Sequence, residues 1–142
     1  MTVDWLILAD SAQVVGGKLY LLGGGWDVLT VLGTFPVTQQ CAVAAAFCVP
    51  WNETNQRHTI EIAIEDQDGR ELARIAGDVE VGRPAGIPPG ADQRIQLANQ
   101  LILEFQHAGE YRIIARVDGG DVVARAPFRI VGWNQPVPIP KP

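Results

Sequence analysis

Residues 111–130 read YRIIARVDGGDVVARAPFRI, and this stretch decides the fold class. Its first half places apolar side chains at every second position, Tyr111, Ile113, Ala115 and Val117. After the turn sequence at 118–120 the same period continues through Val122, Ala124, Ala126, Phe128 and Ile130. A period of two is that of a strand with one buried face. Asp-Gly between two such runs predicts a β-hairpin.

Outward from this hairpin, most of the chain repeats the same period. Alternating or apolar runs bounded by Gly, Pro or Asx cover 3–15, 18–22, 37–49, 60–64, 70–81 and 95–105. Few segments carry the i, i+3, i+4 spacing of a helix. We therefore expect an all-β fold of about eight strands, a two-sheet antiparallel β-sandwich of immunoglobulin- or fibronectin-like type. A closed β-barrel is the alternative.

Local features refine this expectation. The run 37–49 is rich in alanine, which predicts the close approach of a facing layer. Asn99 interrupts the leucine alternation of 95–105 and predicts a bulge. We expect one β-domain over residues 1–132, followed by a tail over 133–142. Alternate prolines in that tail lack a backbone donor, so an extended, polyproline-like C-terminal arm is expected there.

Composition limits the partners and the compartment. The chain has 142 residues, 47% of them hydrophobic, and a net charge of -5 with eleven scattered Lys and Arg. Nucleic acid and anionic membranes attract basic stripes, so neither is an expected partner. Asp10 interrupts the first apolar run, unlike a secretory signal. Cys41 and Cys48 lie seven residues apart on one predicted strand, too far to bridge each other. Free thiols in a cytoplasmic protein are the expectation.

The connector between the runs 37–49 and 60–64 holds the densest set of functional side chains. It contributes Trp51, Asn52, Glu53, Asn55, Arg57 and His58 as candidate binding residues. Arg83, in a proline-rich loop, and Trp26, after a glycine run, are further candidates. Loops on a rigid scaffold commonly carry recognition. The alternative is structural: the amides satisfy backbone groups and Trp51 closes the end of the core.

Several runs together resemble a known family. They are residues 4–10, the sequence GGGWD at 23–27, VPWNETN at 49–55, GRP at 82–84 and PPG at 88–90. This combination is similar to an uncharacterised family of short bacterial, mainly actinobacterial, all-β proteins, a domain of unknown function. The resemblance covers nearly the whole chain and implies a stand-alone single domain. It implies no catalytic role for any residue.

Known reaction centres are incomplete in this sequence. Glu53 with His58 is the best acid-base pair, but no nucleophile stands at a recognisable elbow. His58 and His107 are the only imidazoles, fewer ligands than a zinc site needs. The sequence DQDG at 66–69 lacks the later ligands of a calcium loop. We therefore expect no catalytic residues, no metal and no cofactor.

The expected function is a non-enzymatic binding or assembly module that associates with itself or with another protein. Trp133, Val137 and Ile139 in the tail are the candidate assembly residues. The alternative is a binder of a small ligand or carbohydrate that stacks on Trp51 and Trp26. An enzyme using Glu53 and His58 is the third reading.

Overall fold

The computed structural model describes residues 1–133 and 140 of the chain. Its strands are β1 (Thr2–Val15), β2 (Lys18–Gly24), β3 (Val28–Val31), β4 (Val37–Val49), β5 (Arg57–Asp66), β6 (Glu71–Glu80), β7 (Gln93–Phe105), β8 (Gly109–Val117) and β9 (Val122–Gly132). A single 3-10 turn, η1 (Trp51–Glu53), follows β4. The all-β class is confirmed. The described residues form nine strands, one more than the expected eight, because β3, with only four residues, lies outside the runs that the sequence predicts.

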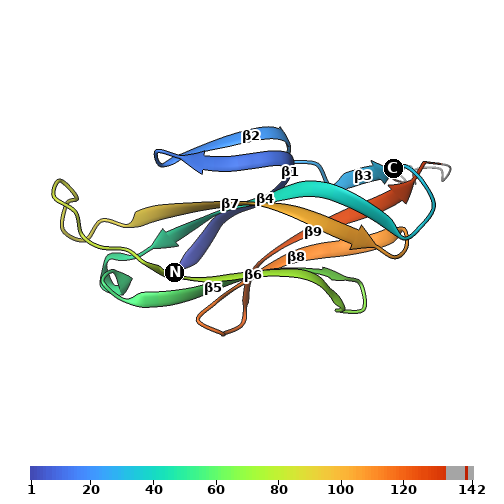
Figure 1. The fold of residues 1–142 in the computed structure, drawn as a ribbon. Helices are drawn as coiled ribbons and strands as arrows, with labels where there is room; N and C mark the ends of the chain where they lie inside the picture. Colours follow the sequence, from blue (N-terminus) through green and yellow to red (C-terminus); the bar gives the residue numbers. More distant parts are fainter. Residues whose placement is uncertain (134–139, 141–142) are drawn as a thin grey trace.

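The strands form two sheets (Figure 1). The first sheet has the order β2-β1-β4-β7, and the second has the order β3-β9-β8-β5-β6. The expectation of purely antiparallel sheets is wrong at one place: β3 runs parallel to β9, with Val28 beside Arg129 and Val31 beside Gly132. The chain leaves the first sheet after β2 and reaches the edge of the second, where the last strand supplies the partner.

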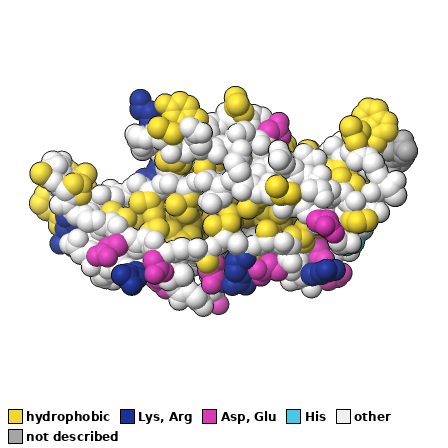
Figure 2. Space-filling model, viewed as in Figure 1, with side chains coloured by type: hydrophobic (Ala, Val, Ile, Leu, Met, Phe, Trp, Pro, Cys, Tyr) yellow, Lys and Arg dark blue, Asp and Glu magenta, His cyan; other side chains and the backbone are white. Residues whose placement is uncertain are grey.

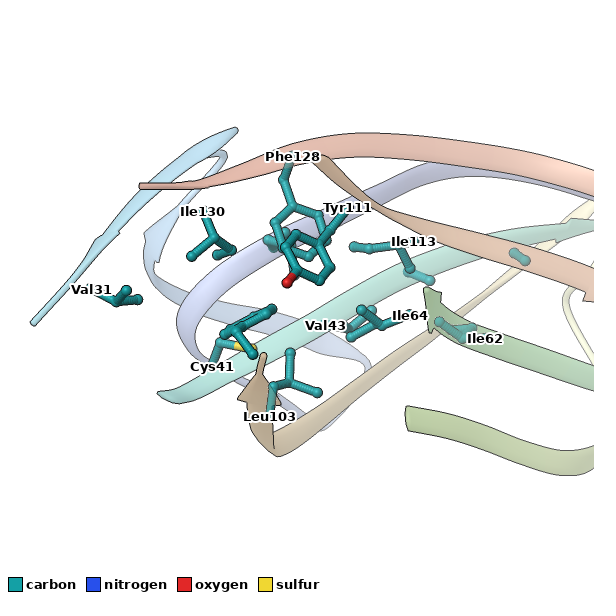
Figure 3. Packing of buried hydrophobic residues seen from close by; sticks show 14 of the residues in the cluster. Val31, Cys41, Val43, Ile62, Ile64, Leu103, Tyr111, Ile113, Phe128 and Ile130 are labelled. Carbon is teal, nitrogen blue, oxygen red and sulfur yellow. The ribbon is translucent and has the colours of Figure 1, made fainter. Parts of the chain in front are cut away.

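The inner faces of the two sheets share one hydrophobic core. Alternation places Ile60, Ile62 and Ile64 of β5 in this core, as the period of two predicted. Aromatic rings fill one end: Phe105 meets Tyr111 at 4.9 Å and Tyr111 stacks on Phe128 at 5.7 Å, measured between ring centroids. Figure 3 shows Tyr111 and Phe128 converging with Leu103, Ile113 and Ile130 between the layers. The shared core fixes which face of each sheet points inward.

A third layer covers part of the first sheet. β1 pairs with β4 only from Thr2 to Ala9, and its remainder pairs with β2. The resulting hairpin lies over the outer side of the sheet (Figure 1), where Gln96 donates to the backbone oxygen of Gly17 at 2.8 Å. Ala42 and Ala44 lie beneath it and are fully buried. The alanine-rich strand thus allows the close approach that its composition predicted.

The ladder between β4 and β7 corrects another expectation. It runs without a register shift from Val37 beside Phe105 to Val49 beside Gln93. The bulge predicted at Asn99 is absent from this ladder, because Asn99 pairs with Val43 in regular register. Asn99 instead stands on the inward side of β7, in line with Leu97 and Leu101, but at the edge of the sheet, where it stays exposed.

The two cysteines point to opposite faces of β4. Cys41 belongs to the core between the sheets, where burial raises the pKa of its thiol to about 11. Cys48 is half-buried, and burial is also the main cause of its raised thiol pKa. Both thiols are free.

The last strand, β9, stops at Gly132. The backbone N–H of Trp133 still donates to the oxygen of Val31 at 3.1 Å, and its side chain is exposed. Val137 and Ile139 lie outside the described residues, as does most of the expected arm. Within the described residues no helix is long and apolar enough to cross a membrane.

Candidate functional site

The connector between β4 and β5 is a short, ordered loop built by its own sequence. Pro50, with φ of -63°, ends β4 and starts the 3-10 turn η1. Asn55 adopts a left-handed φ of 57°, which asparagine tolerates better than most residues. Its backbone N–H donates to Val81 at 2.7 Å and ties the loop to the end of β6. This contact comes from the Asn55 backbone and not from its side-chain amide.

Arg83 closes over this loop from the proline-rich segment that follows β6. Its guanidinium carbon lies 3.9 Å from the centre of the Trp51 ring. Its Nε donates to the Thr54 hydroxyl at 2.7 Å and its Nη2 to the Trp51 oxygen at 2.9 Å. Thr54 is buried, and its hydroxyl also donates to the Trp51 oxygen at 2.6 Å. One face of the Trp51 ring is therefore occupied by an internal cation–π contact.

Both ring nitrogens of His58 are engaged. Nδ1 lies 2.9 Å from Oδ2 of Asp118 and Nε2 lies 2.8 Å from the backbone oxygen of Glu53. The hydrogen bond to Asp118 is the main cause of a raised His58 pKa, and it lowers the pKa of Asp118. A protonated imidazole donates to both partners at once. This geometry holds the loop against the turn after β8 and leaves neither nitrogen free for a substrate.

Glu53 does not face His58 with its carboxylate. That carboxylate pairs with the amino group of Met1, while only the Glu53 backbone oxygen reaches His58. The acid-base pair suggested by the sequence is thus not assembled as a carboxylate–imidazole dyad. The contact instead fastens the start of β1 to the loop.

Asn52, Asn55 and Arg57 are exposed members of the candidate set on the connector. The backbone oxygen of Asn52 accepts from Gln56 at 2.9 Å, which closes the turn. Arg57 begins β5 in register with Glu80 on β6. These three exposed side chains are available to a partner at this end of the molecule.

Trp26 is not part of this cluster. Its ring meets the core residue Phe128 edge-on at 6.2 Å, and its buried Nε1 has no hydrogen-bond partner within the described residues. Phe128 of β9 pairs with Tyr111 of β8, and Tyr111 pairs in turn with Asp66 of β5. Asp66 is at the opposite end of β5 from the loop. Nine residues at about 3.3 Å each separate the two ends. Trp26 and Trp51 therefore do not form one stacking platform.

Sequence reasoning missed two partners of the loop: the Met1 amino group and Asp118. Asp118 looks like an ordinary turn residue and lies sixty positions from His58. The Asp-Gly turn after β8 was the only available signal. In residues 1–133 no group of three His, Cys, Asp or Glu side chains is arranged to hold a metal ion.

A family model for a family of unknown function (DUF6941) matches residues 4–131, and the chain belongs to this family. A search of curated proteins found no match. Among solved structures, the chain is similar to the Pseudomonas fluorescens alkylpurine DNA glycosylase AlkC bound to DNA containing an abasic site analog. The identity is 14% and the TM-score 0.37, over 74% of this chain and 28% of that chain. The chain thus spans little more than a quarter of that enzyme.

Proposed function

We propose that this protein is a non-enzymatic module that associates with proteins, its own copies included, through an open edge of its two sheets. The main observation in support of this proposal is the seam between the two sheets at their edge strands, β6 and β7. A cavity of about 170 Å³ opens there, lined by Ile60, Ile62, Ile75, Val79, Leu97, Asn99 and neighbouring residues. Figure 2 shows a band of hydrophobic atoms running along this side between the layers. Such exposed edges pair readily with another chain.

The strand order supports an immunoglobulin-like sandwich as the scaffold. β1, β4 and β7 follow the order A, B, E of that fold, and β5, β8 and β9 follow C, F, G. Tyr111, near the start of β8, donates to the His107 oxygen at 2.6 Å, like the tyrosine corner of that fold. The disulfide and the buried Trp of antibody domains are missing, and residues 82–92 form a loop where strand D would run. The absence of that strand leaves β7 at the edge.

The loop around Trp51 supports the alternative readings less well. A sugar-binding platform needs a free aromatic face, and Arg83 lies over Trp51. An acid-base pair needs facing side chains, and Glu53 meets Met1 instead. We interpret the loop as a structural clamp that presents Asn52, Asn55 and Arg57 and holds Thr54, His58 and Arg83 through internal hydrogen bonds.

The cellular setting belongs to the same proposal. Free thiols and a net charge of -5 suit a bacterial cytoplasmic protein whose partner is a protein, with no role for nucleic acid or membrane. The arm that contains Trp133, Val137 and Ile139 is a second candidate for assembly. Exposure of the Trp133 ring, 71% of its surface, supports that role.

The test compares two variants of the full chain in sedimentation and in purification from the native host. Asn99→Arg places a charge on the open β7 edge, and Leu22→Lys places one on the β2 edge of the same sheet. A stoichiometric partner, a second copy included, should be lost with the first and kept with the second. Equal binding by both variants, or no partner for the unchanged chain, would reject the open edge as the association surface.

A further inference from the structure

We propose that the partner at the open edge is a second copy of this chain, with the two β7 strands paired antiparallel about a twofold axis at Asn99. This inference rests on the proposed function and adds the partner and the register. In this arrangement residue i of one copy lies opposite residue 198 minus i of the other, so that Asn99 faces itself. The two first sheets would join into one continuous sheet.

The β7 edge has none of the usual protection. From Ile95 to Leu103 it carries no charge, no Pro and no Gly. Natural edge strands usually discourage pairing with Lys, Pro or a bulge, and the register of β7 with β4 is unbroken. Among the described residues β7 is the last strand of the first sheet, with no strand beyond it (Figure 1). Its backbone groups on that side are available to a partner.

The inward-facing residues of β7 are symmetric about Asn99. Leu97 would lie opposite Leu101 of the second copy, and Ile95 opposite Leu103. Leu97 and Leu101 are only half-buried in the single chain, so pairing would cover more of their surface. Directly opposed side chains are the pairs that stabilise an antiparallel sheet. The leucine contact would also cover the mouth of the seam cavity, which Leu97 lines.

The outward-facing residues would pair Arg94 with Glu104, Gln96 with Ile102 and Ala98 with Gln100. Arg94 would lie opposite Glu104 at both ends of the paired segment, which brings opposite charges together twice. Both side chains are exposed, and the Arg94 guanidinium already bonds Asp4 at 2.8 Å on the same face. Near the axis, the small Ala98 faces Gln100, which avoids a steric clash. Like charges are absent from every opposed pair of the segment.

Asn99 itself gains a role in this pairing. It stands in line with leucines, is exposed, and takes part in none of the side-chain hydrogen bonds of the described residues. A polar residue on an otherwise apolar face fixes register when it meets its own copy, as buried asparagines do in coiled coils. The two amides, each with a donor and an acceptor, can satisfy one another.

The second sheet can accommodate the same axis. A twofold axis between antiparallel strands is perpendicular to the sheet, so it passes through both layers. The cavity that Asn99 lines is also lined by residues 75–79 of β6, which places this part of β6 near that axis. Antiparallel apposition of β6 about Ala76 would put Arg74, which pairs with Glu71 and Glu61 within the single chain, opposite Asp78. Gly77, next to the axis, has open space around it.

The experiment uses charge pairs at the axis and analytical ultracentrifugation of the full chain. The unchanged chain should sediment as a dimer, twice 15.4 kDa. Asn99→Asp and Asn99→Arg, each alone, place like charges face to face and should weaken the dimer at least about tenfold. Mixing the two variants should restore a dimer, because opposite charges then meet at the axis. Circular dichroism checks that each variant keeps its strands.

Each of the other possible results contradicts one specific part of the proposal. A monomeric unchanged chain that still binds a different protein through β7 overturns self-pairing and leaves the proposed function standing. A dimer unaffected by both variants overturns the β7 interface. A mixture that stays monomeric overturns the axis at Asn99. If the Asn99 variants do not fold, Glu104→Arg, opposite Arg94, replaces them: it should weaken the dimer about as much, and an unchanged dissociation constant contradicts the pairing.

Discussion

The Nδ1 atom of His58 and the Oδ2 atom of Asp118 lie 2.9 Å apart, although sixty residues separate them in the chain. Asp118 also accepts the backbone N–H of Thr59 at 2.9 Å. The carboxylate therefore joins the start of β5 to the turn that follows β8. His58 is also hydrogen-bonded through Nε2 to the backbone oxygen of Glu53, which connects the loop to the same pair.

This pair predicts a stability difference that depends on pH. The His58 pKa is raised above 6.5, so its contribution is complete below that value and is lost as the pH rises through the folded-state pKa. The Asp118 pKa is lowered below 3.8, so its contribution is lost only as the pH falls through that lower value. The pair therefore stabilises the fold most between these two limits.

Asp118→Asn should lower the free energy of unfolding by up to about 1 kcal/mol near pH 5.5, because half of the carboxylate is solvent-exposed and screened. Asparagine tolerates the left-handed φ of 54° at this position. The difference from the unchanged chain should shrink near about pH 9, where His58 is neutral. Urea unfolding at both pH values measures it, with Asp121→Asn as the control. Equal losses at both pH values would contradict the account.

Arg83→Lys should destabilise the fold by about 1 kcal/mol, because lysine cannot stack on Trp51 and also donate to two acceptors in fork geometry. Arg57→Lys, at an exposed position, is the matched control. Near-ultraviolet circular dichroism should report a changed environment of Trp51 in the first variant alone. Equal unfolding free energies for the two variants would show that the Arg83 clamp contributes nothing.

Ala44→Leu should destabilise by about 1–3 kcal/mol, because the added carbons must displace the hairpin of β1 and β2 that covers this residue. The same change at Ala85, in the exposed loop before β7, should have little effect. Chemical unfolding of both variants provides the comparison. A stable Ala44→Leu protein would mean that the third layer is not held against β4.

Truncation after Gly132 separates the two candidate assembly elements. The truncated chain keeps all nine strands, so it should fold and retain the dimer formed by β7. Light scattering measures its mass, and the unchanged chain is the control. A monomeric truncated protein with intact strands would place the interface in the arm instead.

The sequence alone predicts most of the strands and part of the loop. The strand over 37–49 follows from its continuous apolar run, and the core of β5 follows from the alternation over 60–64, although the strand itself extends from Arg57 to Asp66. β3 could not be predicted, because its four residues pair with Arg129 to Gly132, about a hundred positions away. The bulge expected at Asn99 was wrong for a related reason. A polar residue in an apolar series marks a sheet edge equally well, and sequence does not say which strand lies at the edge.

The contacts of the loop also could not be predicted from the sequence alone. Trp51, Thr54 and Arg83 are brought together by the turn after β6, and the sequence offers only their chemical types. That Glu53 would meet Met1 and not His58 depends on where β1 starts beside β4. Local rules predict turns and faces well, whereas partners across sheets are set by the packing of the whole chain.

Hydrogen exchange of the unchanged chain at several protein concentrations tests the central claim most directly. If two copies pair through β7, amides in residues 93–105 become more protected as the concentration rises, while those of the β2 edge, 18–24, exchange at a constant rate. Protection of β7 that does not change across the concentrations over which the protein dimerises, or protection that grows at β2 instead, would contradict the account.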